Sequence, residues 1–273
     1  MLVVLSKNQP FPDPFPEGAI LLIDKPLGWT SFDVVNKVRN LLSRRLGVKK
    51  FKTGHAGTLD PLATGLLILC VGAYTKKIGE FQAMPKEYTG AVTFGATTPS
   101  FDLEKAVDAT YPTAHLTKVL LERVLQQFTG DIVQIPPVFS AVKVDGKRLY
   151  KNARTGAEVA LPERRVRIET LELGDLRPVK ITGTAPVAAS SKGTSVMLHP
   201  DYADGLQADF RVVCSKGTYI RSLVHDIGRA AGSGAYLSSL RRTRTGGFSV
   251  EDAWQMEALT EWIKTGAAPS FQE

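Results

Sequence analysis

A twelve-residue stretch, Gly54–Gly65, places one acidic residue between glycine-rich polar backbone and a long apolar run. Asp60 is followed directly by Pro61, a pair typical of an N-cap and the first position of a helix. The apolar run Leu62–Val71 would then form a buried helix. A carboxylate at a helix N-terminus is favoured as the anion, so we expect Asp60 to be ionised and fixed in place, as a nucleophile or base requires. Capping is a common use of aspartate, and these residues alone favour a capping role.

The rest of the chain predicts an α+β protein. Residues 8–18 carry four prolines and are typical of an extended arm. Thr30 and Asp33 have the spacing of a capping box, and the apolar face that follows predicts a helix to about Ser43. Hydrophobic patterning predicts further helices at 116–128, 149–153 and 222–231, and strands at 19–23, 86–95, 166–173 and 208–214. It also predicts a strand broken by proline at 132–144, and a basic turn with one more strand within 237–250. Strands and helices without regular alternation argue against a doubly wound sheet.

Three other segments are predicted to lie between these elements. The pair Asp145-Gly146 is a hairpin turn signal. Residues 97–110 are predicted to be a loop. Residues 177–208 are rich in Gly, Ala, Ser and Thr and have little pattern, which predicts a mobile excursion.

The chain is basic, with a formal net charge of +7, and its basic residues are clustered. Seven lysines and arginines lie between Val34 and Leu59 without an acidic residue, and seven lie between Arg211 and Gly247 against Asp226 alone. A third group lies between residues 143 and 154. Clusters that converge in the fold would form a phosphate-binding surface. Solvated faces on several sides of the protein are the alternative, and the scarcity of acidic residues favours RNA.

The cysteines, histidines and hydrophobic segments exclude several classes of protein. Cys70 and Cys214 lie in apolar surroundings, which favours buried, reduced thiols in a cytoplasmic protein. The four histidines are far apart, so the sequence has no metal-ligand spacing, and it has no P-loop or dinucleotide-binding fingerprint. The apolar N-terminus is too short for a signal peptide, and no segment is long enough to span a membrane.

Six blocks of residues follow one another along the chain. They are Lys25-Pro26 with Gly28, Thr30 and Ser31; Gly54–Gly65; Lys86–Tyr88; Gln134–Lys143 with Gly146–Gly156; Cys214–Arg221; and Leu240–Thr243 with Gly246–Phe248. In this order they resemble the motifs of the TruB family of tRNA pseudouridine synthases. The resemblance covers most of residues 19–250, and six ordered blocks are far more specific than any one of them.

The resemblance implies the pseudouridine synthase fold, a mixed, mainly antiparallel sheet flanked by helices and loops. It implies a catalytic domain over residues 19–250, with an RNA-clasping insertion at 134–165, after an N-terminal arm at 1–18. Residues 251–273 then form a short tail with one packed helix and no complete RNA-binding PUA domain. Segment 177–208 is longer than the family pattern leads us to expect, and residues 97–102 match it only loosely.

The implied reaction converts the T-loop uridine of tRNA, position 55 in standard tRNA numbering, to pseudouridine. The partner is the T-arm of tRNA, and an accessory role in tRNA folding is also implied. The target base must be flipped out of its stack before the chemistry. No metal or organic cofactor, no membrane and no protein partner is implied, and we expect a monomer.

The resemblance places Asp60 in the position of the catalytic aspartate, which attacks the nucleotide or removes a ribose proton. Arg221 is the expected countercharge, because a guanidinium can hold a carboxylate with two hydrogen bonds; a phosphate contact is its alternative. Lys25 and Pro26 are expected to form a wall of the site, or merely a turn. Leu240 is expected to make an apolar contact near the base.

Two tyrosines and a histidine complete the expected site. Tyr88 offers a face on which uracil can stack, worth roughly 1–3 kcal/mol per base; as an isolated residue it would more often belong to a strand core. Tyr219 would pack over the base or assist proton transfer, or would simply pack at a strand end. His55 would enter the space left by the flipped base, although a lone histidine in a glycine-rich loop is more often a turn residue.

Two other functions compete with this one. The basic clusters alone would suit a non-catalytic tRNA-binding protein or RNA chaperone, which an activity assay on unmodified tRNA separates from an enzyme. A carboxylate-dependent glycosidase would also attack a sugar carbon, but glycosidases normally pair two carboxylates. Asp60 has no acidic partner in the matching blocks, so we rank this function last.

Overall fold

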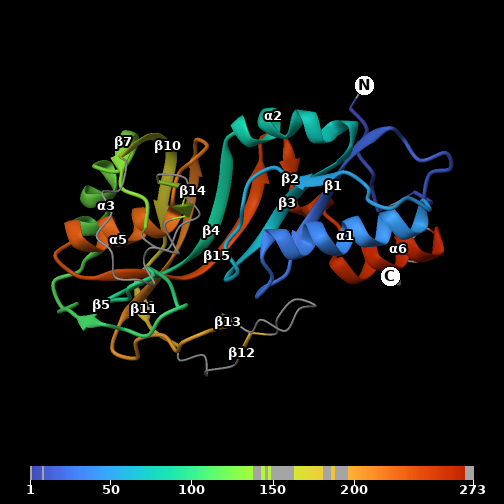
Figure 1. Ribbon diagram of the computed structural model, residues 1–273. Helices are drawn as coiled ribbons and strands as arrows, with labels where there is room; N and C mark the ends of the chain where they lie inside the picture. Colours follow the sequence, from blue (N-terminus) through green and yellow to red (C-terminus); the bar gives the residue numbers. More distant parts are fainter. Residues whose placement is uncertain are drawn as a thin grey trace. The chain divides into compact units, whose positions relative to one another are not determined.

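The computed structural model describes residues 2–7, 9–137, 143–144, 147–148, 163–180, 186–187 and 196–267, and they form two compact units (Figure 1). The Asp60 unit comprises Met1–Glu87, Val187–Val196 and Arg241–Glu273. The Arg221 unit comprises Tyr88–Pro186 and Met197–Leu240. Strands β4 (Lys86–Phe94) and β15 (Ala235–Thr245) have residues in both units.

The Asp60 unit is built on strands in the order β1-β3-β15, with β1 antiparallel to β3. Strand β2 pairs with β3, and β16 pairs with the end of β15. The elements, in chain order, are β1 (Gly18–Lys25), α1 (Ser31–Arg45), β2 (Thr53–His55), β3 (Ala63–Gly72), the 3₁₀ turn η1 (Ala73–Lys77), α2 (Ile78–Ala83), β16 (Phe248–Ser249), the 3₁₀ turn η2 (Val250–Asp252) and α6 (Met256–Thr265).

Helix α1 begins as the sequence predicts. The Thr30 hydroxyl accepts a hydrogen bond from the Asp33 amide at 3.0 Å, and the Asp33 carboxylate accepts one from the Thr30 amide at 3.0 Å. This capping box satisfies two amides that a helix N-terminus leaves without partners. Val34, Val35, Val38 and Leu42 then face the core. The predicted helix is confirmed and ends two residues later than expected, at Arg45.

The predicted helix after Asp60 is wrong, because Leu62–Val71 is largely strand β3. Alternate residues of β3 enter two different cores: Leu67, Leu69 and Val71 pack with α1 and α6, and Leu66, Ile68 and Cys70 pack with Phe81 and Val250. A strand buried on both faces has a continuous apolar run, so its sequence cannot be told from a buried helix by periodicity. Asp60 is therefore followed by a strand, and its carboxylate is not stabilised by the dipole of a following helix.

The N-terminal arm and the C-terminal helix pack on the same face of β1, and Figure 1 shows α1 and α6 side by side. The indole of Trp254 donates to the Leu5 carbonyl at 2.9 Å, and that of Trp262 donates to the Gln9 carbonyl at 2.8 Å. The Phe11 ring contacts Trp262 with 5.0 Å between the ring centroids and an angle of 54° between the ring planes. The predicted packed helix at the C-terminus is confirmed as α6, and the arm is fixed to it.

The Arg221 unit contains the strand order β4-β14-β10-β7, in which β10 is antiparallel to both β14 and β7, and β11 pairs antiparallel with β14. Its helices α3 and α5 contact each other. The remaining elements are β5 (Ala96–Thr97), β6 (Ala109–Thr110), α3 (Lys118–Gln126), β7 (Gly130–Gln134), β8 (Lys143–Val144), β9 (Lys147–Arg148), β10 (Arg164–Leu173), β11 (Arg177–Pro178), β14 (Leu206–Cys214) and α5 (Ile220–Ala230), together with the pair β12 (Pro186–Val187) and β13 (Val196–Met197) at the unit boundary.

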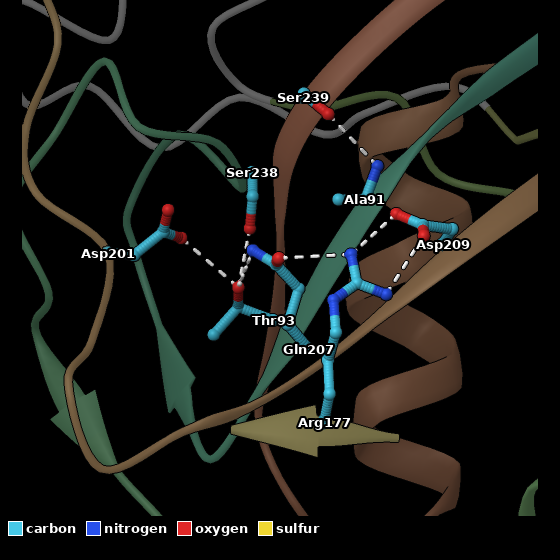
Figure 2. Close-up of polar contacts among 8 residues, drawn as sticks. All are labelled: Ala91, Thr93, Arg177, Asp201, Gln207, Asp209, Ser238 and Ser239. Carbon is cyan, nitrogen blue, oxygen red and sulfur yellow. Dashed lines mark hydrogen bonds and ion pairs between the residues drawn. The ribbon is translucent and has the colours of Figure 1, made fainter. Parts of the chain in front are cut away.

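A polar network ties the strands of the Arg221 unit together (Figure 2). The Thr93 hydroxyl bonds to the Asp201 carboxylate at 3.1 Å and to the Ser238 hydroxyl at 2.5 Å. On β11, Arg177 holds Asp209 with two hydrogen bonds of 2.7 and 2.8 Å. Because Thr93 and Asp201 are buried, their mutual bonds offset the cost of removing them from water.

The predicted α+β class is confirmed, with sheets that are mainly antiparallel and α1, α2, α3, α5 and α6 around them. The pairing of β8 with β9 supports the predicted hairpin. The predicted helix at 149–153, most of the RNA-clasping insertion at 134–165 and much of segment 177–208 lie outside the described residues.

Candidate functional site

Asp60 lies half-buried in the turn between β2 and β3. The Ala63 amide donates to the Asp60 carbonyl at 3.1 Å, which closes a four-residue turn with Pro61 at its second position. Asp at the first and Pro at the second position are the residues that a type I turn favours. The Asp-Pro pair is therefore a turn signal here, and it leads directly into β3.

The turn after β1 holds the backbone on both sides of Asp60. The Ser31 hydroxyl accepts from the Leu59 amide at 2.8 Å and donates to the Leu59 carbonyl at 3.0 Å. On the other side, the Pro61 carbonyl accepts from the Gly28 amide at 2.8 Å. Two residues that flank Asp60 are thus fixed by one segment, which restricts the positions open to its carboxylate.

Lys25 is a fully buried amine next to this turn. Its ammonium donates to the carbonyls of Pro26 at 2.9 Å, Trp29 at 2.6 Å and Pro61 at 3.4 Å. Burial lowers the pKa of Lys25 to about 7, and the Asp60 carboxylate is the strongest charge that acts against this decrease. The structure therefore places Lys25 close to Asp60, with half-buried Pro26 beside it in the chain.

We predict that Lys25 makes the stability of the protein depend on pH. Its pKa is about 7 in the folded protein and 10.5 when exposed. Between these values the unfolded chain binds more protons, so the free energy of unfolding rises with pH. In urea titrations from pH 7 to 9, the free energy of unfolding of wild type should rise relative to that of Lys25→Met by up to about 1.4 kcal/mol per pH unit. Because all other groups are shared, a constant difference between the two proteins would contradict the prediction.

Arg242 reaches the same loop from β15, although the sequence gives no sign of this. Its side chain is 1% exposed. Its Nε donates to the Leu66 carbonyl at 2.7 Å and its Nη2 to the Gly57 carbonyl at 3.1 Å. An arginine in a basic cluster is normally expected at the surface, so the sequence did not predict that Arg242 is buried and donates to two carbonyls around Asp60.

His55 ends strand β2, where it pairs with Leu69 of β3. The ring is half-buried, and its Nδ1 has no hydrogen-bond partner among the described residues. Burial, and after it the charge of Arg242, lowers the pKa of His55. Both effects favour the neutral form of the imidazole.

In the Arg221 unit, Arg221 is a buried residue of α5. Its Nη1 donates to the Ser100 carbonyl at 3.1 Å and lies 3.5 Å from the Asp102 carboxylate. Both charged side chains are 6% exposed, so this is a buried ion pair. Removing either partner of a buried pair would leave the other as an uncompensated charge, which is strongly destabilising. Sequence reasoning missed Asp102, whose only signal was the loose family match at 97–102.

The two tyrosines and Leu240 also belong to the Arg221 unit. Tyr88 is buried at the start of β4. Tyr219 is the N-cap of α5 and is half-buried. Its backbone amide donates to the side chain of Gln134, and its carbonyl accepts from that side chain. The Arg164 guanidinium lies 5.8 Å from the centroid of the Tyr219 ring. Leu240 is half-buried on β15. The prediction that these residues and Arg221 act with Asp60 joins residues of different units and stays a prediction.

The predicted basic clusters differ in exposure. Arg44, Arg45, Lys49, Lys50 and Lys52 of the first cluster are all exposed, at and after the end of α1. In the second cluster, Arg221 and Arg242 are buried, Arg211 pairs with Glu172, and Arg241 pairs with Asp24. In the third cluster, Lys143, Lys147 and Arg148 lie on β8 and β9, and Lys151 and Arg154 lie outside the described residues. The first cluster is therefore the best candidate for phosphate contacts.

The described residues contain no group of three or more His, Cys, Asp or Glu that could hold a metal ion. Across the same part of the chain, no helix has the length and apolar character needed to cross a membrane. Cys70 and Cys214 are buried free thiols, as predicted.

Two family models match consecutive parts of the chain. Residues 43–220 match the N-terminal domain of the TruB family pseudouridylate synthases, and residues 221–270 match the C-terminal domain of tRNA pseudouridylate synthase B. The chain is 52% identical over 251 residues to the tRNA pseudouridine synthase B of Phocaeicola vulgatus, covering 91% of this chain and 94% of that protein. It is 49% identical over 254 residues to the enzyme of the same name from Flavobacterium johnsoniae, covering 93% and 99%. The chain belongs to the TruB family of pseudouridylate synthases, as its motifs predict.

A solved structure, that of a Cbf5-Nop10-Gar1 complex, has the same fold. Its matching chain is 26% identical, with a TM-score of 0.58, over 90% of this chain. The match covers 54% of that chain, so this protein spans about half its length. The predicted pseudouridine synthase fold is confirmed.

Proposed function

We propose that this protein converts the T-loop uridine at position 55 of tRNA to pseudouridine, with Asp60 as the catalytic carboxylate. The supporting observation is the 52% identity over 251 residues to a tRNA pseudouridine synthase B. The fixed turn that carries Asp60, between Ser31 on one side and Lys25 on the other, adds a physical reason for the choice of carboxylate.

The reaction is an isomerisation and needs no oxidant or reductant. The bond between N1 of uracil and C1′ of ribose breaks, the base turns, and a bond forms between C5 and C1′. The proton on C5 is lost to solvent, and N1 gains one. Asp60 either attacks the nucleotide or removes a ribose proton, and both routes require an ionised carboxylate in a fixed position.

The other site residues are proposed to bind the substrate. Arg221 supplies the countercharge to the Asp60 carboxylate, and the ion pair with Asp102 supports the position of its guanidinium. Tyr88 and Tyr219 contact the flipped uracil. A neutral ring at His55 can occupy a base stack without the desolvation cost of a charge.

The wall of the site completes the proposed set. Lys25 and Pro26 form the wall beside Asp60, and Leu240 makes an apolar contact with the base. No cofactor takes part in the proposed reaction. We propose that the protein acts as a monomer in the cytoplasm, where a reducing environment suits its two free thiols.

The proposal is tested by mapping pseudouridine in tRNA from cells that lack this protein. We expect pseudouridine to be lost at the T-loop site and kept at other tRNA positions, with recovery when the wild-type gene is returned. A non-catalytic tRNA-binding protein or RNA chaperone, the alternative function, would leave position 55 modified. Unchanged modification at that position would therefore reject the proposal.

A further inference from the structure

Arg242 bridges the two ends of the loop that carries Asp60. Gly57, whose carbonyl accepts from Nη2, lies three residues before Asp60, and Leu66, whose carbonyl accepts from Nε, lies six residues after it. Hydrogen bonds from a charged donor are stronger than those between neutral groups. One side chain therefore links Gly57, inside the loop, to Leu66 of β3, beyond the point where the backbone pairing of β2 with β3 ends.

The glycines at the two ends of the loop fit closely against Arg242. Gly65 has φ of 99°, and a Cβ built on it would lie 2.3 Å from the backbone oxygen of Arg242. Gly57 has φ of 112°, and its Cβ would lie 3.5 Å from Nη1 of Arg242. Positive φ favours glycine. The backbone conformation of the loop thus requires both glycines. Gly65 lies against the backbone of Arg242, and Gly57 lies against its guanidinium.

The buried charge of Arg242 also acts on its neighbours. A guanidinium stays protonated in proteins, and no phosphate can reach this one while its side chain is 1% exposed. Its charge adds to burial in lowering the pKa of Lys25 and of His55. Arg242 is therefore close to both residues as well as to the loop.

We propose that Arg242 is a positioning residue of the isomerisation, which fixes the Asp60 carboxylate through the Gly57 and Leu66 carbonyls. This inference rests on the proposed function, because it assigns a positioning task for that reaction. Arg242 touches neither the substrate nor the reacting atoms in this role. It acts by restricting the loop.

The test compares Arg242→Lys and Arg242→Gln with wild type in single-turnover assays on unmodified tRNA. Lysine keeps the charge but cannot make both bonds in the geometry of a guanidinium, and glutamine loses the charge. We expect the rate of pseudouridine formation to fall on the order of a hundredfold in both, the scale associated with a misplacement of about 1 Å. The affinity for tRNA should stay within about threefold, since a buried side chain makes no phosphate contact.

Thr245→Val is the matched control. Thr245 lies on the same strand, is 1% exposed, and its hydroxyl has no hydrogen-bond partner among the described residues. Valine preserves its shape, so this variant should keep the wild-type rate. The comparison separates the role of Arg242 from any general sensitivity of β15 to substitution.

Hydrogen exchange provides the measurement that a merely structural role would not reproduce. The Leu59 amide is bonded to the Ser31 hydroxyl inside the loop, whereas the amides that pair β1 with β3 lie outside it. In both Arg242 variants we expect faster exchange at Leu59 and unchanged exchange between β1 and β3.

Two results would overturn the proposal. One is a single-turnover rate within threefold of wild type in both variants. The other is a loss of protection spread over β1 and β3 together with loss of tRNA binding, since Arg242 would then support the whole unit. Failure of the proposed function is a separate result: wild type itself would make no pseudouridine at the T-loop site, whereas the exchange at Leu59 can still be measured.

Discussion

The Asp60→Asn variant is expected to form no detectable pseudouridine and to bind tRNA with nearly wild-type affinity. Asparagine has the shape of aspartate, and the bonds that hold the turn are made by the backbone of Leu59, Pro61 and Ala63. The substitution therefore removes the charge and leaves the loop in place. The rate should fall by at least about 10⁴-fold, the scale on which loss of a nucleophile acts.

The measurement is a single-turnover assay for pseudouridine on an unmodified tRNA transcript, with a binding titration on the same preparation. Asp33→Asn is the matched control. Asp33 is a second carboxylate that acts on the pKa of Lys25, and it is the N3 residue of the α1 capping box, where its side chain accepts from the Thr30 amide. Asparagine keeps a side-chain oxygen that can accept this hydrogen bond, so this variant should keep its activity. Substantial product from Asp60→Asn would remove Asp60 from the catalytic role.

The affinity for tRNA should fall on the order of a thousandfold between about 50 and 200 mM salt. This estimate assumes roughly six neutralised phosphates, each of which releases counterions. The exposed lysines and arginines of the first cluster, at and after the end of α1, are the expected source of most of these contacts. Titrations with the Asp60→Asn protein measure binding without turnover.

The contribution of this cluster can be tested directly. Replacing Lys49 and Lys50 with glutamine should lower the slope of log affinity against log salt by about 0.7–0.9 per lysine. Lys118→Gln is the control, because Lys118 is also exposed to solvent but pairs with Asp175 at 2.9 Å in the Arg221 unit. A salt profile as steep as that of wild type in the double variant would show that the RNA binds elsewhere.

Local signals predicted most of the elements but could not place long-range contacts. The Thr30–Asp33 capping box and the periodicity of α1 depend on residues a few positions apart, and both are confirmed. The run after Asp60 was assigned to the wrong element because its environment is decided by α1 and α6 on one face and by Phe81 and Val250 on the other. No window of the sequence contains those partners.

The same limit applies to the site. Motif blocks identified Lys25, and its position beside Asp60 is observed. The last block also contains Arg242, but no role was assigned to it there, and the charge pattern placed it in a basic cluster. Counting charges cannot tell a buried arginine from a solvated one. Its acceptors are carbonyls 176 and 185 residues earlier in the chain. Backbone acceptors carry no side-chain signature, so the sequence could not reveal them.

The closure of the Asp60 unit by the C-terminus has a consequence for synthesis of the protein. Trp254 and Trp262 complete the core above β1, and Arg242 completes the loop around Asp60. All three are synthesised long after β1 and β3. Domains generally fold as units, and distant contacts are formed slowly. The nascent chain must therefore hold β1 and β3 without these partners, and a chain interrupted before Arg242 lacks both hydrogen bonds that link Gly57 and Leu66.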